Sequence, residues 1–130
     1  MLETGIKGRF ETVVGDADTA SAVMSGALDV LATPRMIALF EYTAAASVQE
    51  YLEEGQTTVG TKINITHDAA TPLGMKVVIM TELVEVDRRR LVFKCEAADE
   101  CGHIGGGMQE RFIVDSERFM NKVLEKKQEN

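Results

Sequence analysis

Three side chains in this sequence could support acid–base or nucleophilic chemistry: Thr33, Glu41 and His67. Glu41 stands out because a helix over residues 34–53, at about 100° per residue, places its carboxylate within an apolar stripe. A buried, unpaired carboxylate costs roughly several kcal/mol, or it takes up a proton. We therefore expect Glu41 to have a partner, which a subunit interface could supply, or to be used chemically. The stripe comprises Ile37, Phe40, Ala44, Val48, Tyr51 and Leu52.

His67 ends a predicted strand over residues 57–67, in which Ile63 and Ile65 alternate with polar residues. The imidazole should therefore face the helix, while Glu41 faces the sheet. A carboxylate beside an imidazole favours the protonated ring and orients it, whereas burial opposes charging either group alone. The pattern predicts a tuned general base made by Glu41 and His67. The alternative is structural, in which His67 bonds a nearby carbonyl or pairs with Asp68.

The hydroxyl of Thr33 could complete a set of nucleophile, base and orienting group. Thr33 precedes Pro34, and this order is typical of an N-cap followed by the first helical residue. Local evidence alone favours the N-cap role. A catalytic Thr33 would have to turn back over the helix, because Glu41 lies about 12 Å further along the axis at 1.5 Å per residue.

Gly60 and Arg111 are candidate substrate-binding residues. Gly60 interrupts a β-branched strand, so it marks a bulge or leaves its amide open to a ligand, and Arg111 is a surface residue or the partner of a buried acid. Glycines 105–107 indicate a second bulge or a close approach of the backbone.

Cys95, Cys101 and His103 follow no closed zinc-site spacing, so we expect no metal.

Size and charge narrow the class of protein. The 130 residues suffice for one domain spanning residues 1–130. The net charge of −7 argues against a nucleic-acid partner but allows a small anionic ligand at a local basic patch. No uncharged apolar stretch is long enough to cross a membrane, and residues 1–10 do not resemble an export signal. We therefore expect a cytoplasmic protein with free thiols.

The order of elements predicts an α+β fold. A strand over residues 5–14 precedes short helical turns over 17–32 and the long helix over 34–53. Strands over 57–67, 75–86, 90–98 and 103–114 follow, and residues 116–127 form a charged terminal helix. One long helix with consecutive antiparallel strands favours the hot-dog fold, in which an antiparallel sheet wraps one central helix.

The block from Gly60 to Gly74 (GTKINITHDAATPLG), with Glu41 upstream and residues 107–123 (GMQERFIVDSERFMNKV) downstream, resembles the fluoroacetyl-CoA thioesterase-like family of hot-dog proteins. The resemblance extends over residues 27–124 and implies a homodimer that hydrolyses short acyl-CoA thioesters. It also implies a catalytic set at Thr33, Glu41 and His67. Gly60 would lie beside the acyl group, and an arginine of the last strand falls on Arg111.

The sequence departs from this family in the segment before the helix. Fluoroacetyl-specific members carry a longer segment with aromatic residues there, which acts as a lid. Residues 15–32 of this chain contain no Phe, Tyr or Trp. We therefore expect an acyl group other than fluoroacetyl.

The predicted function is hydrolysis of a small acyl-CoA thioester, with coenzyme A as part of the substrate and no other cofactor. His67 would activate Thr33 or a water molecule, and Glu41 would orient His67 or attack the carbonyl itself. Backbone amides near Gly60 would polarise the carbonyl oxygen. One alternative is a non-catalytic acyl-CoA-binding protein or sensor. Another is a hot-dog enoyl-CoA hydratase or dehydratase, which also uses a histidine and an acid.

Overall fold

The computed structural model describes residues 1–127, so residues 128–130 of the predicted domain lie outside the described part. Among residues 1–127, no helix is both long and apolar enough to span a membrane. The strands are β1 (Lys7–Val13), β2 (Gln56–His67), β3 (Lys76–Asp87), β4 (Arg90–Asp99) and β5 (Gly102–Asp115). The helices are α1 (Thr33–Gln49) and α2 (Ser116–Leu124), with short 3-10 turns η1 (Asp16–Asp18) and η2 (Glu125–Lys127).

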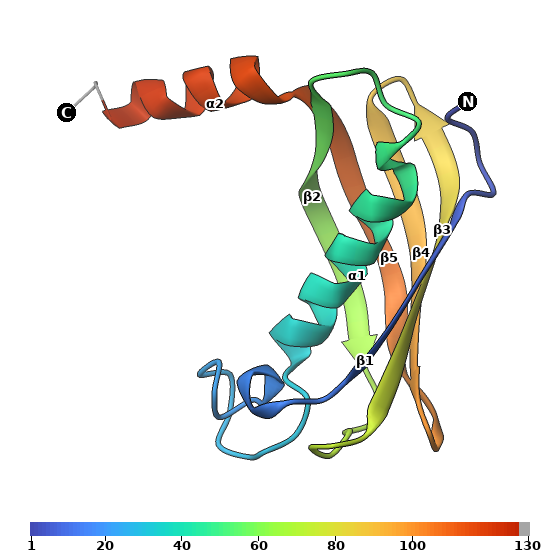
Figure 1. Cartoon of the computed structure of the whole chain (residues 1–130), viewed down its shortest axis with the longest axis vertical. Coiled ribbons are helices and arrows are strands. Elements are labelled where there is room, and N and C mark those ends of the chain that lie inside the picture. Colours follow the sequence, from blue (N-terminus) through green and yellow to red (C-terminus); the bar gives the residue numbers. More distant parts are fainter. Residues whose placement is uncertain (128–130) are drawn as a thin grey trace.

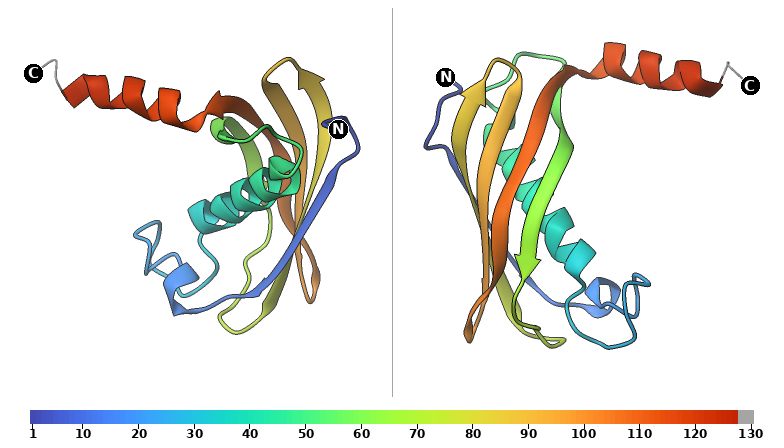
Figure 2. Two further views of the ribbon diagram at one scale, coloured as in Figure 1. Left: turned by 45° about the horizontal axis from the view of Figure 1, so that its top comes forward. Right: turned by 180° about the vertical axis from the view of Figure 1, so that it is seen from behind.

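The five strands form one antiparallel sheet in the order β1-β3-β4-β5-β2. The sheet curves around α1, and residues 15–32 form a loop at the end where α1 begins (Figures 1 and 2). The helix and the four consecutive strands were predicted in this order, and this arrangement confirms the α+β prediction. The predicted short turns over 17–32 are present only in the first part, as η1 and a turn in which the amide of Val23 donates to the carbonyl of Thr19. The rest is loop, held by isolated bridges between Thr19 and Leu31 and between Val30 and Pro72.

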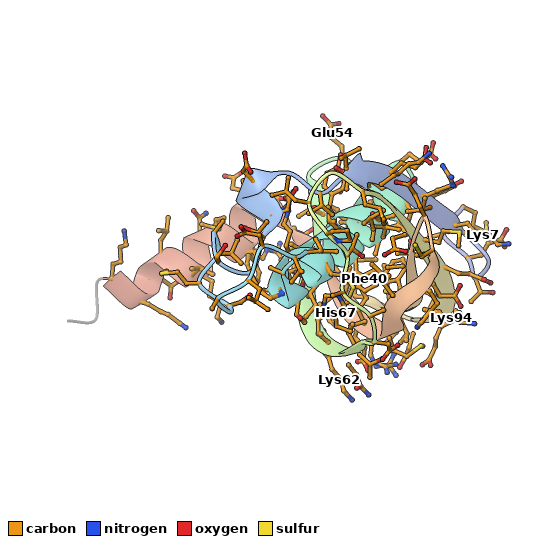
Figure 3. All side chains as sticks on the ribbon, turned by 90° about the horizontal axis from the view of Figure 1, so that it is seen from below. Lys7, Phe40, Glu54, Lys62, His67 and Lys94 are labelled. Atoms are coloured by element: carbon orange, nitrogen blue, oxygen red, sulfur yellow. The ribbon has the colours of Figure 1, made fainter. Side chains whose placement is uncertain are left out.

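The core lies between α1 and the concave face of the sheet. Phe40 and Phe93 are fully buried there, and Figure 3 shows Phe40 inside the curve of the sheet while Lys62 and Lys94 project outward. The helix ends at Gln49, earlier than the predicted residue 53. Leu52 still packs against the core from the turn beyond the helix, whereas Tyr51 is exposed. The buried residues of α1 are Met36, Leu39, Phe40, Thr43, Ala44 and Val48.

A β-bulge in β2 decides which of its side chains face α1. The pairing of β2 with β5 shifts between Gly60 and Lys62, so the alternation reverses there. Before the bulge Gly60 pairs with Arg111, and after it His67 pairs with Gly105. The expected uninterrupted alternation from residue 57 to residue 67 is therefore wrong at its start, because an extra residue turns Val59 to the opposite face.

Candidate active site

The hydroxyl of Thr33 lies 2.7 Å from Nδ1 of His67, which joins the start of α1 to the end of β2. Thr33 is the first residue of the helix, Ala32 is the N-cap, and no side chain of the described residues makes a capping bond there. The N-cap prediction for Thr33 is therefore wrong. The extended backbone of Ala32 places Thr33 inside the helix, where its hydroxyl reaches the imidazole instead of the amides of the first turn.

Backbone hydrogen bonds hold both ends of this pair. Before the helix, the amide of Ala32 donates to the carbonyl of Asp18 at 2.9 Å, and the amide of Leu31 donates to the carbonyl of Thr71 at 2.9 Å. After the strand, the amides of Asp68 and Ala69 donate to the carbonyl of Ile104 at 2.7 and 3.1 Å. The Thr33–His67 contact is thus set by the main chain on both sides.

The second ring nitrogen of His67, Nε2, is buried and has no hydrogen-bond partner in the described part of the chain. Burial lowers the pKa of His67 below its ordinary value, and the nearby charge of Asp68 opposes this effect. The imidazole is therefore neutral around pH 7. A buried polar atom without a partner is rare in folded proteins and is typical of a site that binds another group.

The β5 glycine opposite His67 brings the backbone and α1 close together. A Cβ atom on Gly105 would lie 2.6 Å from the carbonyl oxygen of Thr66 and 2.9 Å from Cε of Met36. This contact confirms the close approach predicted for glycines 105–107. Any side chain at position 105 would clash with the main chain of β2 beside His67 and would displace the end of the Met36 side chain.

Glu41 extends from α1 over Gly60 and faces Arg111. Its Oε2 lies 3.9 Å from Nη1 of Arg111, and a Cβ atom on Gly60 would approach the same oxygen to 2.6 Å. The Glu41 side chain is 40% exposed. The apolar stripe predicted a more deeply buried carboxylate, but the missing side chain at Gly60 leaves this face of β2 open beside Glu41.

Arg111 is the buried partner of this acid, one of the two roles considered for it. Its side chain is 8% exposed, its Nε donates to Oγ1 of Thr58 at 2.8 Å, and its Nη2 donates to the carbonyl of Thr58 at 3.1 Å. Burial lowers the pKa of the Arg111 guanidinium, and the charge of Glu41 opposes that shift. The two bonds to Thr58 fix the guanidinium on the inner face of the sheet.

The predicted trio therefore divides into two groups along α1. Thr33 and His67 are in contact, while Glu41 lies with Gly60 and Arg111. Within residues 1–127, no hydrogen bond or ion pair joins Glu41 to His67, so the expected direct meeting of these two groups is not found. The reason is the length of the helix, because Thr33 and Glu41 are about 12 Å apart along its axis.

An open pocket of about 250 Å³ lies beside the Thr33–His67 pair. Sequence reasoning missed most of its wall, which comes from the loop before α1 and from the turn after β2. The only sequence signal was the run of small residues in each segment. Its lining residues are Ala20, Ser25, Val30, Leu31, Thr33, His67, Asp68, Ala69 and Ala70.

Comparison with known proteins places these features in a family. The family model described as fluoroacetyl-CoA-specific thioesterase matches residues 14–117. The chain is also 40% identical over 98 residues to the fluoroacetyl-CoA thioesterase of Streptantibioticus cattleyicolor, across 75% of this chain and 70% of that enzyme. The chain belongs to this family. Membership in the fluoroacetyl-CoA-specific thioesterase family was predicted from the residues 60–74 block, and the prediction is confirmed.

Solved structures agree with this assignment. A structure of a fluoroacetyl-CoA thioesterase matches with a TM-score of 0.92 and 32% identity, covering 97% of this chain and 98% of that one. A hot-dog-like protein from Thermanaerovibrio acidaminovorans matches with a TM-score of 0.88 and 23% identity, covering 96% of this chain and 93% of that one. The second similarity concerns the fold alone, and it confirms the predicted hot-dog fold.

Proposed function

We propose that this protein hydrolyses the thioester bond of a small acyl-CoA. The observation that carries the proposal is the 2.7 Å contact between Thr33 and His67 beside an open pocket, in a chain of the fluoroacetyl-CoA-specific thioesterase family. The free Nε2 of His67 adds support, because a buried ring nitrogen without a partner among residues 1–127 can accept or donate to a reacting group.

Neutral His67 acts as the general base in this proposal. With the proton on Nε2, Nδ1 accepts the proton of Thr33 or of a water molecule held in its place. The activated oxygen attacks the thioester carbonyl, and the thiolate of coenzyme A leaves. If Thr33 is the nucleophile, water then cleaves the acyl-enzyme to release the carboxylic acid and restore the hydroxyl.

Glu41 is proposed to act on the acyl group rather than on His67. Its carboxylate occupies the space over Gly60 that a Cβ atom would fill, so an acyl group that reaches this part of the main chain meets Oε2 of Glu41. The guanidinium of Arg111 faces this carboxylate across the strand, with Nη1 3.9 Å from Oε2. From this position Glu41 is the alternative nucleophile that attacks the carbonyl carbon and displaces the thiolate of coenzyme A, while the main chain near Gly60 polarises the carbonyl oxygen.

The acyl group is proposed to be one other than fluoroacetyl. The loop before α1 contributes only small or aliphatic residues to the pocket, namely Ala20, Ser25, Val30 and Leu31. Within residues 1–127, no aromatic side chain lines this wall to contact a fluorine atom. A short aliphatic acyl group suits both the wall and the volume.

The same proposal includes a cytoplasmic homodimer that needs no cofactor beyond the coenzyme A of its substrate. The two free thiols, Cys95 and Cys101, support a reducing compartment. The edge position of β2 supports dimerisation, because an edge strand offers unpaired backbone groups to a second copy.

Release of free thiol from a panel of short, branched and aromatic acyl-CoAs tests the function. Wild type should turn over at least one of them, and His67→Ala, Thr33→Ala and Glu41→Gln should each lose turnover while still binding the substrate. Glu50→Gln is a matched control that should keep turnover, since Glu50 caps the far end of α1. Tight acyl-CoA binding without thiol release by wild type would indicate a sensor, and water addition to an enoyl-CoA would indicate a hydratase.

A further inference from the structure

The terminal helix α2 exposes an apolar face. Its four large apolar side chains, Phe119, Met120, Val123 and Leu124, are each between 38% and 48% exposed, and α2 buries none of its residues. Their spacing of one and four residues places them on one side of the helix. A contiguous apolar face of this kind on a folded protein indicates a surface that another structure covers.

The helix begins at the open edge of the sheet. Asp115, the residue before α2, pairs with Gln56, the first residue of β2, and β2 is one of the two edge strands. From there α2 runs outward past β2 and away from the rest of the sheet (Figures 1 and 2). At 1.5 Å per residue its nine residues extend about 14 Å, or nearly three strand spacings beyond the point where it starts.

An apolar hollow lies in the angle between β5 and α2. It has a volume of about 330 Å³, and its wall includes Phe112 and Val114 from β5 and Phe119 and Val123 from α2. Phe112 is itself exposed. The apolar face of α2 therefore continues onto the sheet beside the same open edge.

We propose that α2 is a dimer clamp, which packs its apolar face on a second copy of this chain. The inference rests on the homodimer proposed above, in which two β2 edges pair antiparallel in one continuous sheet. The two-fold axis of that pairing is perpendicular to the sheet and reverses the second copy. The Gln56 end of β2, where α2 leaves, then lies beside the end of β2 that carries His67 in the partner.

The clamp thus crosses the line where the two β2 strands pair, next to the partner's pocket. A second copy fits this surface better than a membrane does, because the polar side of α2 and the turn after it mix Glu117 and Glu125 with Arg118 and Lys122 on a chain of net charge −7. A clamp also enlarges the interface, because pairing of one strand edge alone is narrow and stable dimers bury about 800 Å² on each partner.

The absence of tryptophan from this chain allows a direct test. In Phe119→Trp, the fluorescence emission of the new tryptophan should be blue-shifted at high protein concentration, where the dimer buries it. The emission should shift to the red on dilution, in step with dissociation of the dimer measured by light scattering. In Met80→Trp, a matched control at an exposed site of β3 away from the β2 edge, emission should not change with dilution. A dimer in which the indole introduced by Phe119→Trp stays solvent-exposed would overturn the clamp and leave the edge pairing intact.

A second variant measures the strength of the clamp. Phe119→Ser with Val123→Ser should raise the dimer dissociation constant by roughly 100-fold or more, because symmetry removes each contact twice. Met80→Ser should leave that constant unchanged. An unchanged constant in the double variant would overturn the proposal. A wild type that is monomeric at every concentration, yet releases thiol from an acyl-CoA, would overturn both the clamp and the dimer while leaving the hydrolase standing.

Discussion

Oγ1 of Thr33 lies 2.7 Å from Nδ1 of His67, although the two residues are 34 positions apart in the chain. The contact replaces the capping bond that a threonine at a helix start would otherwise make. Its position at the mouth of a pocket gives this hydroxyl and this imidazole a chemical use that neither has alone.

Thr33→Ala should separate the catalytic role from a structural one. We expect kcat/KM to fall about 100-fold or more, because the oxygen that His67 activates is lost. Thr33→Ser should stay within about tenfold of wild type. The free energy of unfolding should change by less than the roughly 1 kcal/mol that loss of an N-cap costs, because Thr33 makes no capping bond within the described chain. A loss of stability in Thr33→Ala with unchanged turnover would contradict the assignment.

Gly60→Ala should disturb Glu41 specifically. The added methyl group would lie 2.6 Å from Oε2 of Glu41 and 3.4 Å from Nη1 of Arg111, so the carboxylate has to move. We expect turnover to fall at least tenfold, because the carboxylate leaves its place beside Arg111. The unfolding free energy should fall by less than about 1 kcal/mol, because the displaced atoms are the end of a flexible, partly exposed side chain. In the Glu41→Ala background the same substitution should cost much less stability, as a double-mutant cycle from urea unfolding would measure. Equal costs in both backgrounds would show that the two positions do not interact.

Arg111→Met should destabilise the fold more than Glu41→Gln does. The arginine is buried and donates two bonds to Thr58, whereas Glu41 is partly exposed and 3.9 Å away. Removing Arg111 leaves Oγ1 of Thr58 without this donor, so we expect a loss of about 1–3 kcal/mol, against less than about 1 kcal/mol for Glu41→Gln. The loss of unfolding free energy in Arg111→Lys should lie between those of the other two variants, since lysine keeps the positive charge but cannot make both bonds to Thr58. Thermal and urea unfolding of the three variants would check the order.

The activity should decline on the acid side with the protonation of His67. Burial lowers the pKa of His67 below its ordinary value of 6.5, so kcat/KM should rise with pH through a midpoint below 6.5 and level off above it. The free energy of unfolding should also rise with pH in this range. In the unfolded chain His67 has its ordinary pKa of about 6.5, so the unfolded chain binds a proton more readily than the folded chain does. The contribution of neutral His67 to stability is therefore complete above about pH 6.5 and is lost as the pH falls toward the pKa of His67 in the folded chain. A midpoint above 6.5 would indicate a protonated, acid-paired imidazole instead.

The two cysteines should react very differently with a thiol reagent. Burial raises the pKa of Cys95 to about 11, and the bond from Gln109 only partly opposes this shift, while Cys101 is exposed. At pH 8 roughly one Cys95 in a thousand is a thiolate, so a disulfide reagent should modify one thiol per folded chain and two after denaturation. Cys101→Ser should reduce the folded count to zero. Rapid modification of two thiols in the native protein would show that the core around Cys95 opens.

Much of the fold could be predicted from local patterns, because helix and strand periodicities are properties of neighbouring residues. The helix start near Pro34, the four consecutive strands and the terminal helix all follow from such patterns. The errors fall where distant contacts override local preference. The loop over residues 19–31 is held by one bridge between its own ends and a second bridge from Val30 to Pro72, and α1 ends at Gln49 although the apolar pattern continues to Leu52.

The candidate site divides in the same way. The sequence by itself determined which chemical groups are present, since a carboxylate among apolar residues and an imidazole at a strand end are visible without coordinates. Only the tertiary structure decided which groups lie together, since it places His67 in contact with Thr33 and Glu41 beside Arg111. Two physical reasons apply. The length of α1 separates Glu41 from Thr33 and His67, and one extra residue at the bulge after Gly60 reverses which side chains of β2 face α1, which places Gly60 beside Glu41. The sequence offered a bulge at Gly60 as one of two interpretations, and only the pairing of β2 with β5 shows that the register shifts there.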